Sequence, residues 1–189
     1  MQDYILEARK LIPEHICKKF ILYFDEENYL KDAQTVGPKK DATVDKQIRN
    51  CQTSHLSAIK LSFGQKTVLN YVKSKIFDVG KVYEQRFPRF NLSKLNQIDL
   101  LKYKANSYDA GYKWHIDASG KTAERIVSIS ICLNNDFKGG EFMFDLPEGE
   151  KQYPQNVGDL IMFPSNFMFP HQVNKVKKGT RYAIIAWGV

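Results

Sequence analysis

The sequence lacks several features that would place the chain in a specialised class. No apolar run approaches the length of a membrane span, and the stretch MQDYILEARK at the N-terminus has no signal-peptide core. We find no internal repeat and no low-complexity tract. Only three cysteines occur, Cys17, Cys51 and Cys132, and none forms a C-x-x-C pair. This usage favours reduced thiols over a disulfide framework, so we expect a cytoplasmic protein without a membrane segment.

The bulk composition fits a single globular domain covering residues 1–189. A chain of this size can bury a substantial core, and 43% apolar with 13% aromatic residues exclude a disordered chain. The formal net charge is +7, and lysines are spread widely along the sequence. This charge permits an acidic or nucleic-acid partner without demanding one, because a solvated basic surface explains it equally well.

Two stretches in the first half have helical periodicity. Between residues 12 and 24, apolar side chains recur every four residues, and Pro13 suits a first-turn position. A longer stretch, residues 64–87, repeats helical spacing until Pro88 ends it. We expect residues 1–90 to be mainly helical support, with the longer helix docked on the back of a sheet. Its predicted core stripe is Val68, Val72, Ile76, Val79 and Tyr83.

The stretch between these helices carries weaker signals. Residues 31–50 are polar, and Gly37-Pro38 marks a loop. A plain connector is the simpler interpretation, and a cover over an active-site mouth is the alternative. His15 and His55 have no metal-ligand companion at short spacing, so we interpret both as surface or structural histidines.

After Pro88 the pattern becomes strand-like. Short runs rich in β-branched and aromatic residues are separated by turn signals such as Asn134-Asn135, Gly139-Gly140 and Gly158. A series of six or more short strands favours a β-sandwich or barrel. The runs are residues 98–103, 126–133, 141–145, 159–163, 171–176 and 181–187.

One of these runs, IVSISICL at residues 126–133, predicts two distinct faces. Alternate positions point to opposite sides of a strand, so its bulky residues share one face and its small residues share the other. The bulky face calls for a core, whereas the small, mildly polar face suits a cavity wall or a tightly packed sheet. The bulky set is Val127, Ile129, Ile131 and Leu133, and the small set is Ser128, Ser130 and Cys132.

The stretch YKANSYDAGYKWHID, residues 103–117, carries the chemistry. It places His115 and Asp117 two residues apart, which in a strand puts both side chains on one face. His171 is the plausible third ligand downstream. Two histidines and one carboxylate with open positions form the facial triad of non-haem iron(II) sites. The absence of thiolates from this set argues against structural zinc.

Four sequence segments together resemble the 2-oxoglutarate and iron(II)-dependent dioxygenases, in particular their prolyl 4-hydroxylase-like branch. They are YDAGYKWHID, GGEF, HQV and KGTRYAIIAW, and they span Ile98 to Val189. The resemblance implies an α+β, mainly β fold: a double-stranded β-helix (jelly roll) core over residues 98–189, with N-terminal helices packed on one sheet. It also implies Fe(II), with 2-oxoglutarate and O2 as cosubstrates and ascorbate as a reductant.

The resemblance also suggests residue roles. An anion in a cavity with few waters needs a partner, and the guanidinium of Arg181 can hold the far carboxylate of 2-oxoglutarate through paired hydrogen bonds. A three-residue turn around Lys177 to Gly179 would put His171 and Arg181 on one face of a hairpin, whereas a two-residue turn would put them on opposite faces. Tyr103 resembles the family tyrosine that touches the cosubstrate, with Tyr108 or Tyr112 as alternatives. Further candidates for lining the cavity or contacting substrate are Tyr112, Trp114, Cys132, Glu141, Trp187, Arg49 and Arg125.

The expected activity is hydroxylation of a C–H bond, with succinate and carbon dioxide as co-products. Peptidyl proline, in a peptide or protein, is the substrate class that the resemblance implies. Two other classes stay open: an AlkB-type nucleic-acid demethylase, which the basic charge would suit, and a non-catalytic jelly-roll binding protein. AlkB-type enzymes have a second arginine six residues after the first, and here that position is Trp187.

Overall fold

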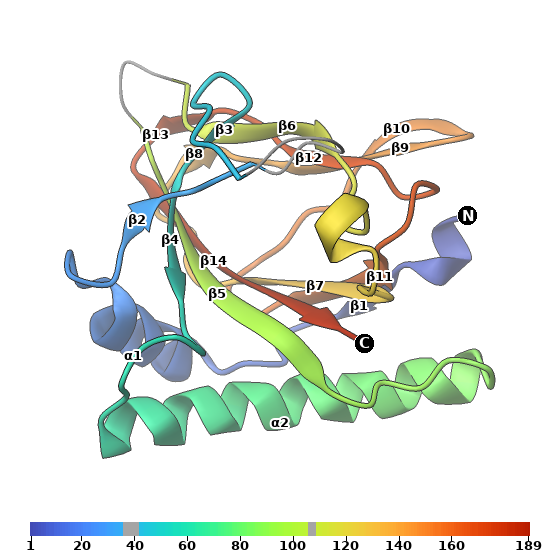
Figure 1. Ribbon diagram of the computed structural model, residues 1–189, viewed down its shortest axis with the longest axis horizontal. Coiled ribbons are helices and arrows are strands. Elements are labelled where there is room, and N and C mark those ends of the chain that lie inside the picture. Colours follow the sequence, from blue (N-terminus) through green and yellow to red (C-terminus); the bar gives the residue numbers. More distant parts are fainter. Residues whose placement is uncertain (36–41, 106–108) are drawn as a thin grey trace.

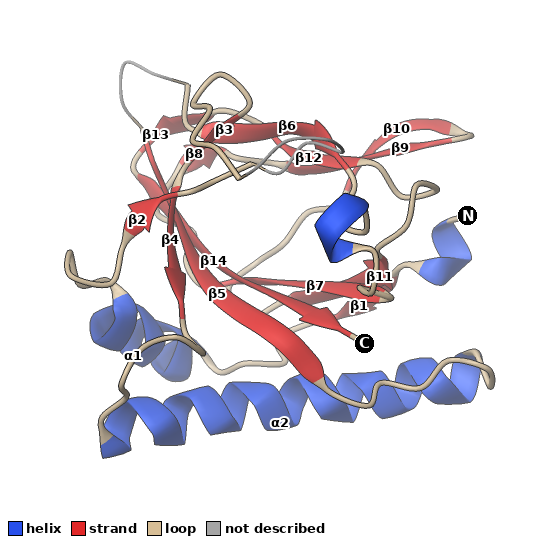
Figure 2. Cartoon of the chain, in the orientation of Figure 1, coloured by secondary structure: helices blue, strands red, loops and turns tan. Residues whose placement is uncertain are grey.

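The computed structural model describes residues 1–35, 42–105 and 109–189, and in these ranges the chain is mainly β with two α-helices. Two antiparallel sheets face each other, and α2 runs beneath the larger one (Figure 1). Figure 2 shows the same layers by element type, with α1 and α2 on one side of the strands. The helices are α1 (Glu14–Phe24) and α2 (Phe63–Arg86), with short 3₁₀ turns η1 (Gln2–Tyr4) and η2 (Gly120–Thr122).

The larger sheet has seven strands, and every adjacent pair is antiparallel. Its centre is formed by strands that are far apart in sequence, because β14 lies between β7 and β5. In sheet order the strands are β1 (Leu6–Ala8), β11 (Leu160–Pro164), β7 (Val127–Cys132), β14 (Thr180–Gly188), β5 (Leu95–Lys104), β4 (Gln52–His55) and β2 (Lys31–Asp32).

The smaller sheet has five strands and covers the face of the larger sheet that is turned away from α2 (Figure 1). In order these are β10 (Gly149–Gln152), β9 (Phe142–Leu146), β12 (His171–Val173), β6 (Gly111–His115) and β3 (Arg49–Asn50). A separate ribbon pairs β13 (Val176–Lys178) with β8 (Lys138–Gly139).

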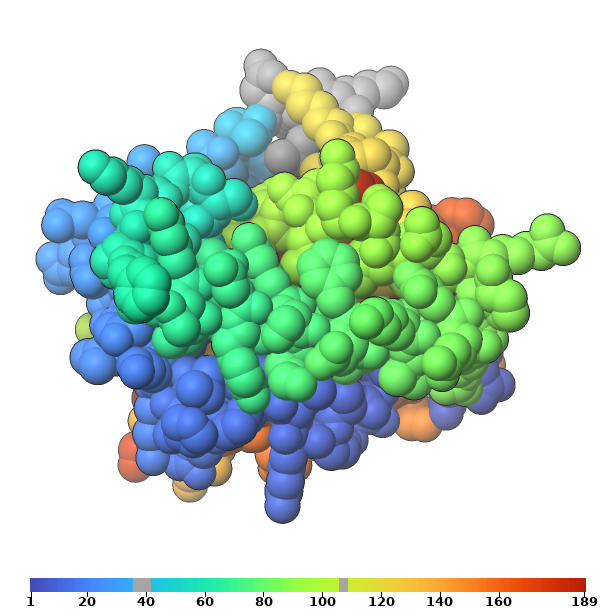
Figure 3. Space-filling model, turned by 90° about the horizontal axis from the view of Figure 1, so that it is seen from below, coloured from blue at the N-terminus to red at the C-terminus, as the bar shows by residue number. Residues whose placement is uncertain are grey.

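The predicted long helix is confirmed as α2. Ser62 caps it: its hydroxyl accepts from Gln65 N–H, and the Gln65 side chain accepts from Ser62 N–H in return. All five residues of the predicted stripe are buried, and they pack on Ile98, Leu100 and other residues of the larger sheet. Figure 3 shows this face from below, with α2 in green crossing the molecule beside the blue N-terminal segment.

The first predicted helix is confirmed as α1, two residues shorter than expected at its start. Pro13 is the N-cap rather than a first-turn residue, since the helix begins at Glu14. Phe20 and Phe24 are buried and their rings lie 4.6 Å apart between centroids. The side chain amide of Gln65 donates to the Tyr23 carbonyl, which ties α1 to the start of α2.

Strand alternation divides the apolar residues into two layers. The bulky face of β7 joins the core under α2, as the IVSISICL pattern predicts, and its small residues face the other sheet. β5 and β14 alternate in the same way: Leu100 and Ile184 join the core under α2, whereas Tyr103 and Trp187 lie between the sheets. The space between the two sheets is therefore walled by polar and aromatic side chains of the larger sheet.

The N-terminal half is less helical than expected. Besides the two helices it supplies β1, β2, β3 and β4, which complete edges of both sheets. These strands have two to four residues each, too short for an alternating pattern to be legible. The predicted run 171–176 is likewise divided between β12 and β13, and Gly37-Pro38 and Lys39-Lys40 of the expected 31–50 connector lie outside the described residues.

The three cysteines are buried free thiols, in agreement with the absence of a disulfide pattern. In the described part of the chain neither helix combines the length and the apolar character that a membrane crossing requires.

Candidate active site

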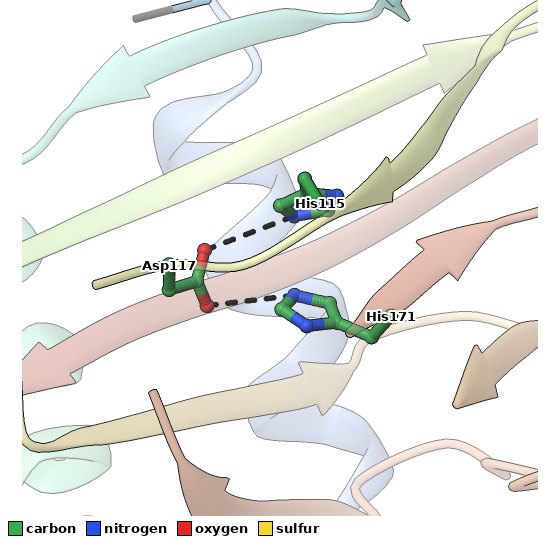
Figure 4. A group of neighbouring side chains, drawn as sticks. All are labelled: His115, Asp117 and His171. Atoms are coloured by element: carbon green, nitrogen blue, oxygen red, sulfur yellow. Dashed lines mark ion pairs between the residues drawn. The ribbon is translucent and has the colours of Figure 1, made fainter. Parts of the chain in front are cut away.

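Three side chains converge between the two sheets (Figure 4). Nε2 of His115 lies 3.7 Å from Oδ1 of Asp117, and Nε2 of His171 lies 3.4 Å from Oδ2 of the same carboxylate. One ligand atom from each of the three residues lies within 4.8 Å of the others. This is the set expected from the sequence. The spacing fits a single metal ion held by two imidazoles and one carboxylate.

Both imidazoles present the nitrogen that a metal needs. Nδ1 of His115 lies 2.8 Å from the Lys113 carbonyl, and Nδ1 of His171 lies 3.1 Å from the Phe169 carbonyl. A carbonyl only accepts, so each Nδ1 carries the proton and each Nε2 has a free lone pair. Burial, and then the nearby His171, lower the pKa of His115 to about 3, which keeps its ring neutral at neutral pH.

Asp117 is positioned by polar contacts rather than by a strand. We expected His115 and Asp117 in one strand, but β6 ends at His115. The Ser128 hydroxyl on β7 donates to Asp117 Oδ2 at 2.6 Å, and the Thr122 hydroxyl in η2 donates to the Asp117 carbonyl at 2.7 Å. Ser128 also contacts the Ser165 hydroxyl at 2.8 Å. The small face of β7 thus fixes the carboxylate, a role that its sequence pattern did not reveal.

A bulge in β6 aims His115 at the site. His171 on β12 pairs with His115, whereas Val173 pairs with Tyr112, so the register shifts by one residue between them. Tyr112 and His115 consequently share a face, with their rings stacked 3.5 Å apart between centroids. A Cβ at Gly111 would lie 2.9 Å from the Val173 carbonyl, so only glycine allows β6 this close to β12.

Arg181 lies on the opposite sheet from His171. The expected hairpin between them is wrong, because β12 pairs with β6 and β9 whereas β14 pairs with β5 and β7. Both side chains nevertheless border one cavity between the sheets. The even spacing between His171 and Arg181 suggested one face of a hairpin. In the structure the two side chains instead reach the same cavity from strands in opposite sheets.

The Arg181 guanidinium is buried without a negative partner in the described part of the chain. It is 2% exposed, and Nη2 donates to Gln155 Oε1 at 3.3 Å. Tyr103, directly opposite on β5, is fully buried, and its hydroxyl has no hydrogen-bond partner among the described residues. Burial raises the pKa of Tyr103, so the hydroxyl keeps its proton. A buried cation beside an unpaired donor fits an anionic ligand.

The cavity has a volume of about 240 Å³ and connects the triad with Arg181. Tyr112 and Trp187, both candidates from the sequence, line it. Arg125 also lines it, with its guanidinium carbon 3.7 Å from the centre of the Trp187 indole and Nη1 3.5 Å from the Asp117 carbonyl. Arg49 borders the same space, 4.8 Å above the Tyr112 ring.

Other sequence candidates lie elsewhere. Trp114 is 38% exposed and absent from the cavity wall, because the β6 bulge turns Tyr112 and His115 inward instead. Cys132 and Glu141 border a second, smaller pocket on the far side of Arg181. Lys175 pairs with Asp109 in an outer groove. Tyr108, an alternative to Tyr103, lies outside the described residues.

Sequence reasoning missed several of the residues that line the cavity, among them four polar residues of β4 and β5. Thr53 and His55 come from β4, and Gln97 and Asp99 come from the start of β5. In β5 the sequence did hold an indication, because Gln97 and Asp99 lie an even number of residues from Tyr103 and so share its face of the strand. β4 has only four residues, too few to show an alternating pattern.

Comparisons with known proteins point to one family. The family model described as "2OG-Fe(II) oxygenase superfamily" matches residues 100–188. A PKHD-type hydroxylase of Idiomarina loihiensis is 33% identical over 94 residues, covering 48% of this chain and 41% of that relative. The chain spans less than two thirds of the length of this and the other curated relatives compared.

The fold is shared with solved structures at low sequence identity. A prolyl hydroxylase from Trichoplax adhaerens, solved in complex with a peptide fragment of the hypoxia inducible factor oxygen degradation domain, has a TM-score of 0.82 at 16% identity. That match covers 98% of this chain and 83% of the other. A Pseudomonas putida prolyl-4-hydroxylase has a TM-score of 0.75 at 19% identity, covering 98% and 91% respectively.

Proposed function

We propose that the chain belongs to the 2OG-Fe(II) oxygenase superfamily, whose model matches residues 100–188, and that it is a 2-oxoglutarate-dependent dioxygenase that hydroxylates peptidyl proline. The observation that carries the proposal is the pairing of two features in one cavity: a His115–Asp117–His171 cluster and the buried Arg181. A metal ligand set without an anion anchor, or the reverse, would fit many proteins. Their combination fits this reaction class.

The residues present fit the cofactors. His115, Asp117 and His171 would hold Fe(II), and Arg181 with Tyr103 would hold the distal carboxylate of 2-oxoglutarate. When bound, iron and cosubstrate supply the oxidising chemistry with O2. The protein's own contributions are to fix Nε2 of both imidazoles through Nδ1 contacts, to orient the Asp117 carboxylate through Ser128, and to exclude water around Arg181. Ascorbate would act as the reductant that keeps the metal as Fe(II).

The finer description of the fold belongs to the same proposal. The two facing antiparallel sheets would form the double-stranded β-helix (jelly roll) of this enzyme class, and residues 1–189 would form one domain. Two observations support this reading: the likeness to the two prolyl hydroxylase structures extends over 98% of the chain, and α2 and the larger sheet share one core.

Proline peptides are the proposed substrates on two grounds. One structural neighbour was solved with a peptide bound, and the curated relatives are hydroxylases. Trp187 stands where a nucleic-acid demethylase would have its second arginine, and here it stacks with Arg125. An aromatic surface beside a guanidinium suits the apolar ring and polar backbone of a peptidyl proline.

The direct test is succinate formation from labelled 2-oxoglutarate with Fe(II), O2 and ascorbate, with and without proline peptides. We expect Fe(II)-dependent turnover that proline peptides stimulate, with one oxygen atom added to the peptide by mass spectrometry. Asp117→Ala should abolish it, whereas His15→Ala, which changes an exposed histidine on α1, should not. Demethylation of a methylated oligonucleotide without any response to proline peptides would favour the demethylase instead, and absence of 2-oxoglutarate binding would favour a non-catalytic protein.

A further inference from the structure

A second polar cluster lies at the end of the cavity away from Arg181. The inward-facing residues of β5 run from Tyr103, opposite Arg181, to Gln97, opposite Trp187. At the Gln97 end, four polar side chains from three separate segments meet. We call this set the mouth cluster; it consists of His55, Gln97, Asp99 and Arg125.

The hydrogen bonds of the mouth cluster converge on Asp99. Arginine only donates, so Nη2 of Arg125 donates to Gln97 Oε1 at 2.9 Å and fixes which way the amide points. Gln97 Nε2 then donates to Asp99 Oδ2 at 2.8 Å and also lies 3.1 Å from His55 Nδ1. The other carboxylate oxygen, Oδ1, lies 2.9 Å from His55 Nδ1. The Asp99 side chain is 2% exposed, and each of its oxygens has a donor.

This arrangement determines what His55 can offer a ligand. Nδ1 lies nearer to the Asp99 oxygen, at 2.9 Å, than to the Gln97 amide nitrogen, at 3.1 Å, and an ionised carboxylate only accepts, so the Nδ1 proton points to Asp99. Nε2 has no hydrogen bond within the described residues, and the His55 side chain is 53% exposed. The ring is thus held in place with one free nitrogen. Protonation turns that nitrogen from an acceptor into a donor.

The charges around His55 favour the donor form and an anionic ligand. The hydrogen bond to Asp99 raises the pKa of His55 above its ordinary value, although partial burial and the cations Arg49 and Lys31 oppose this. Each Asp99 oxygen already has a donor, so the charged groups next to His55 that remain for a ligand are cationic: Arg49, Lys31 and the nearby Arg125. Arg125 also faces the carboxylates of Asp117 and Glu124.

We propose that His55, held by Asp99, is a specificity-determining residue that donates a hydrogen bond to an acidic side chain of the substrate. The inference rests on the proposed function, because it assigns one end of that cavity to the substrate rather than to 2-oxoglutarate. It adds a preference that depends on pH: the substrate carboxylate is recognised while His55 is protonated and loses its donor as the pH rises.

The test measures peptide binding rather than turnover. Two fluorescein-labelled proline peptides, identical except that the residues flanking proline are glutamate in one and glutamine in the other, are titrated by anisotropy. The protein is loaded with Mn(II) and 2-oxoglutarate under anaerobic conditions, from pH 5.5 to pH 8.5. We expect the glutamate peptide to bind about tenfold more tightly at low pH, with this preference lost as pH rises.

Variants separate recognition from structure. His55→Gln should remove the preference for the glutamate peptide over the glutamine peptide at every pH. Asp99→Asn should keep the ring but shift the loss of preference to lower pH, because the group that stabilises the imidazolium is neutralised. His15→Gln, an exposed histidine on α1, is the matched control and should behave as wild type. Circular dichroism and Tm establish that each variant is folded.

Several outcomes would overturn the inference. These are equal binding of the two peptides by wild type, binding of neither, or a preference that survives His55→Gln. Titration with Mn(II) and 2-oxoglutarate in the absence of peptide distinguishes a failure of the proposed function from a failure of the role of His55. If both bind while the peptide preference is absent, the proposed function stands and the role of His55 fails. If 2-oxoglutarate does not bind, the proposed function fails first.

Discussion

Arg181 and Tyr103 are direct neighbours across β14 and β5, with the guanidinium carbon 5.6 Å from the centre of the phenol ring. Neither polar group has a charged partner in the described part of the chain, and both side chains are almost completely buried. Folding alone gains little from burying such a pair. Ligand binding would supply the missing partner, so these two residues should report on cosubstrate affinity.

Replacing Arg181 by Gln is expected to weaken 2-oxoglutarate binding about a hundredfold or more, since a buried carboxylate loses its charged partner. Tyr103→Phe removes one neutral donor and should cost about 1 kcal/mol, or about fivefold. Calorimetric titration of the Mn(II)-loaded protein measures both. Metal affinity should stay unchanged in each variant. Unaltered 2-oxoglutarate affinity in Arg181→Gln would place the anchor elsewhere.

Ser128→Ala should lower Fe(II) or Mn(II) affinity about ten- to a hundredfold, because the hydroxyl orients the Asp117 carboxylate. Ser130→Ala is the matched control: it lies on the same face of β7, but its hydroxyl faces Gln155 at 3.4 Å. Metal titration followed by competition with a chelator gives both affinities. Equal loss in the two variants would mean that general packing of β7, not this hydrogen bond, governs the site.

Ile76→Ala on α2 should reduce the free energy of unfolding by about 2–5 kcal/mol, because a fully buried side chain leaves a cavity against the larger sheet. Val82→Ala on the same helix should change it by less than about 0.5 kcal/mol, since Val82 is 51% exposed. Urea unfolding followed by circular dichroism provides the comparison. Similar effects at the two positions would contradict the docking of α2 described above.

Asp159 should make the free energy of unfolding depend on pH in the acid range. Burial alone would raise its pKa, but the backbone N–H groups of Lys10 and Asn156 and the Arg9 guanidinium favour the charged form, and the pKa of Asp159 is lowered. A carboxyl group whose pKa is lowered in the folded state adds to the free energy of unfolding at pH values above its ordinary pKa of about 3.9. That contribution is lost as the pH falls through the lowered pKa.

Asp159→Asn is therefore expected to be less stable than wild type at pH 7, by about 1–3 kcal/mol. The difference should narrow as the pH is lowered below about 4. Thermal unfolding of both proteins between pH 7 and pH 3 measures the gap. A gap that is constant across this range would show that the Asp159 charge contributes nothing.

The parts of the fold that the sequence predicted well are those with long periodic signals. α2 carries its apolar stripe from Val68 to Tyr83, and β7 alternates over its full length, so the face that each side chain takes follows directly from spacing. The triad and Arg181 were found because their chemistry requires particular residue types in a recognisable order. Their assignment as ligands stays a prediction until metal and cosubstrate binding are measured.

The parts that were missed depend on tertiary pairing. His171 and Arg181 are ten residues apart, and parity alone could not show that the chain crosses from one sheet to the other between them. The β6 bulge is invisible in the sequence because it is defined by the register against β12. His55 lacked any sequence neighbour to suggest a role. Its partner Asp99 is brought to it only by the pairing of β4 with β5.

The central position of β14 has a consequence for how the protein reaches this structure. β5 and β7 do not pair with each other, and the strand between them places Gly188 opposite both Leu95 and Val127. The sheet that carries Arg181 and Asp99 therefore cannot be completed until β14, which ends at residue 188, has left the ribosome. Such long-range pairing slows folding, because distant segments must meet before their contacts form. During synthesis the inner edges of β5 and β7 stay unpaired, which makes this stage the one most exposed to aggregation.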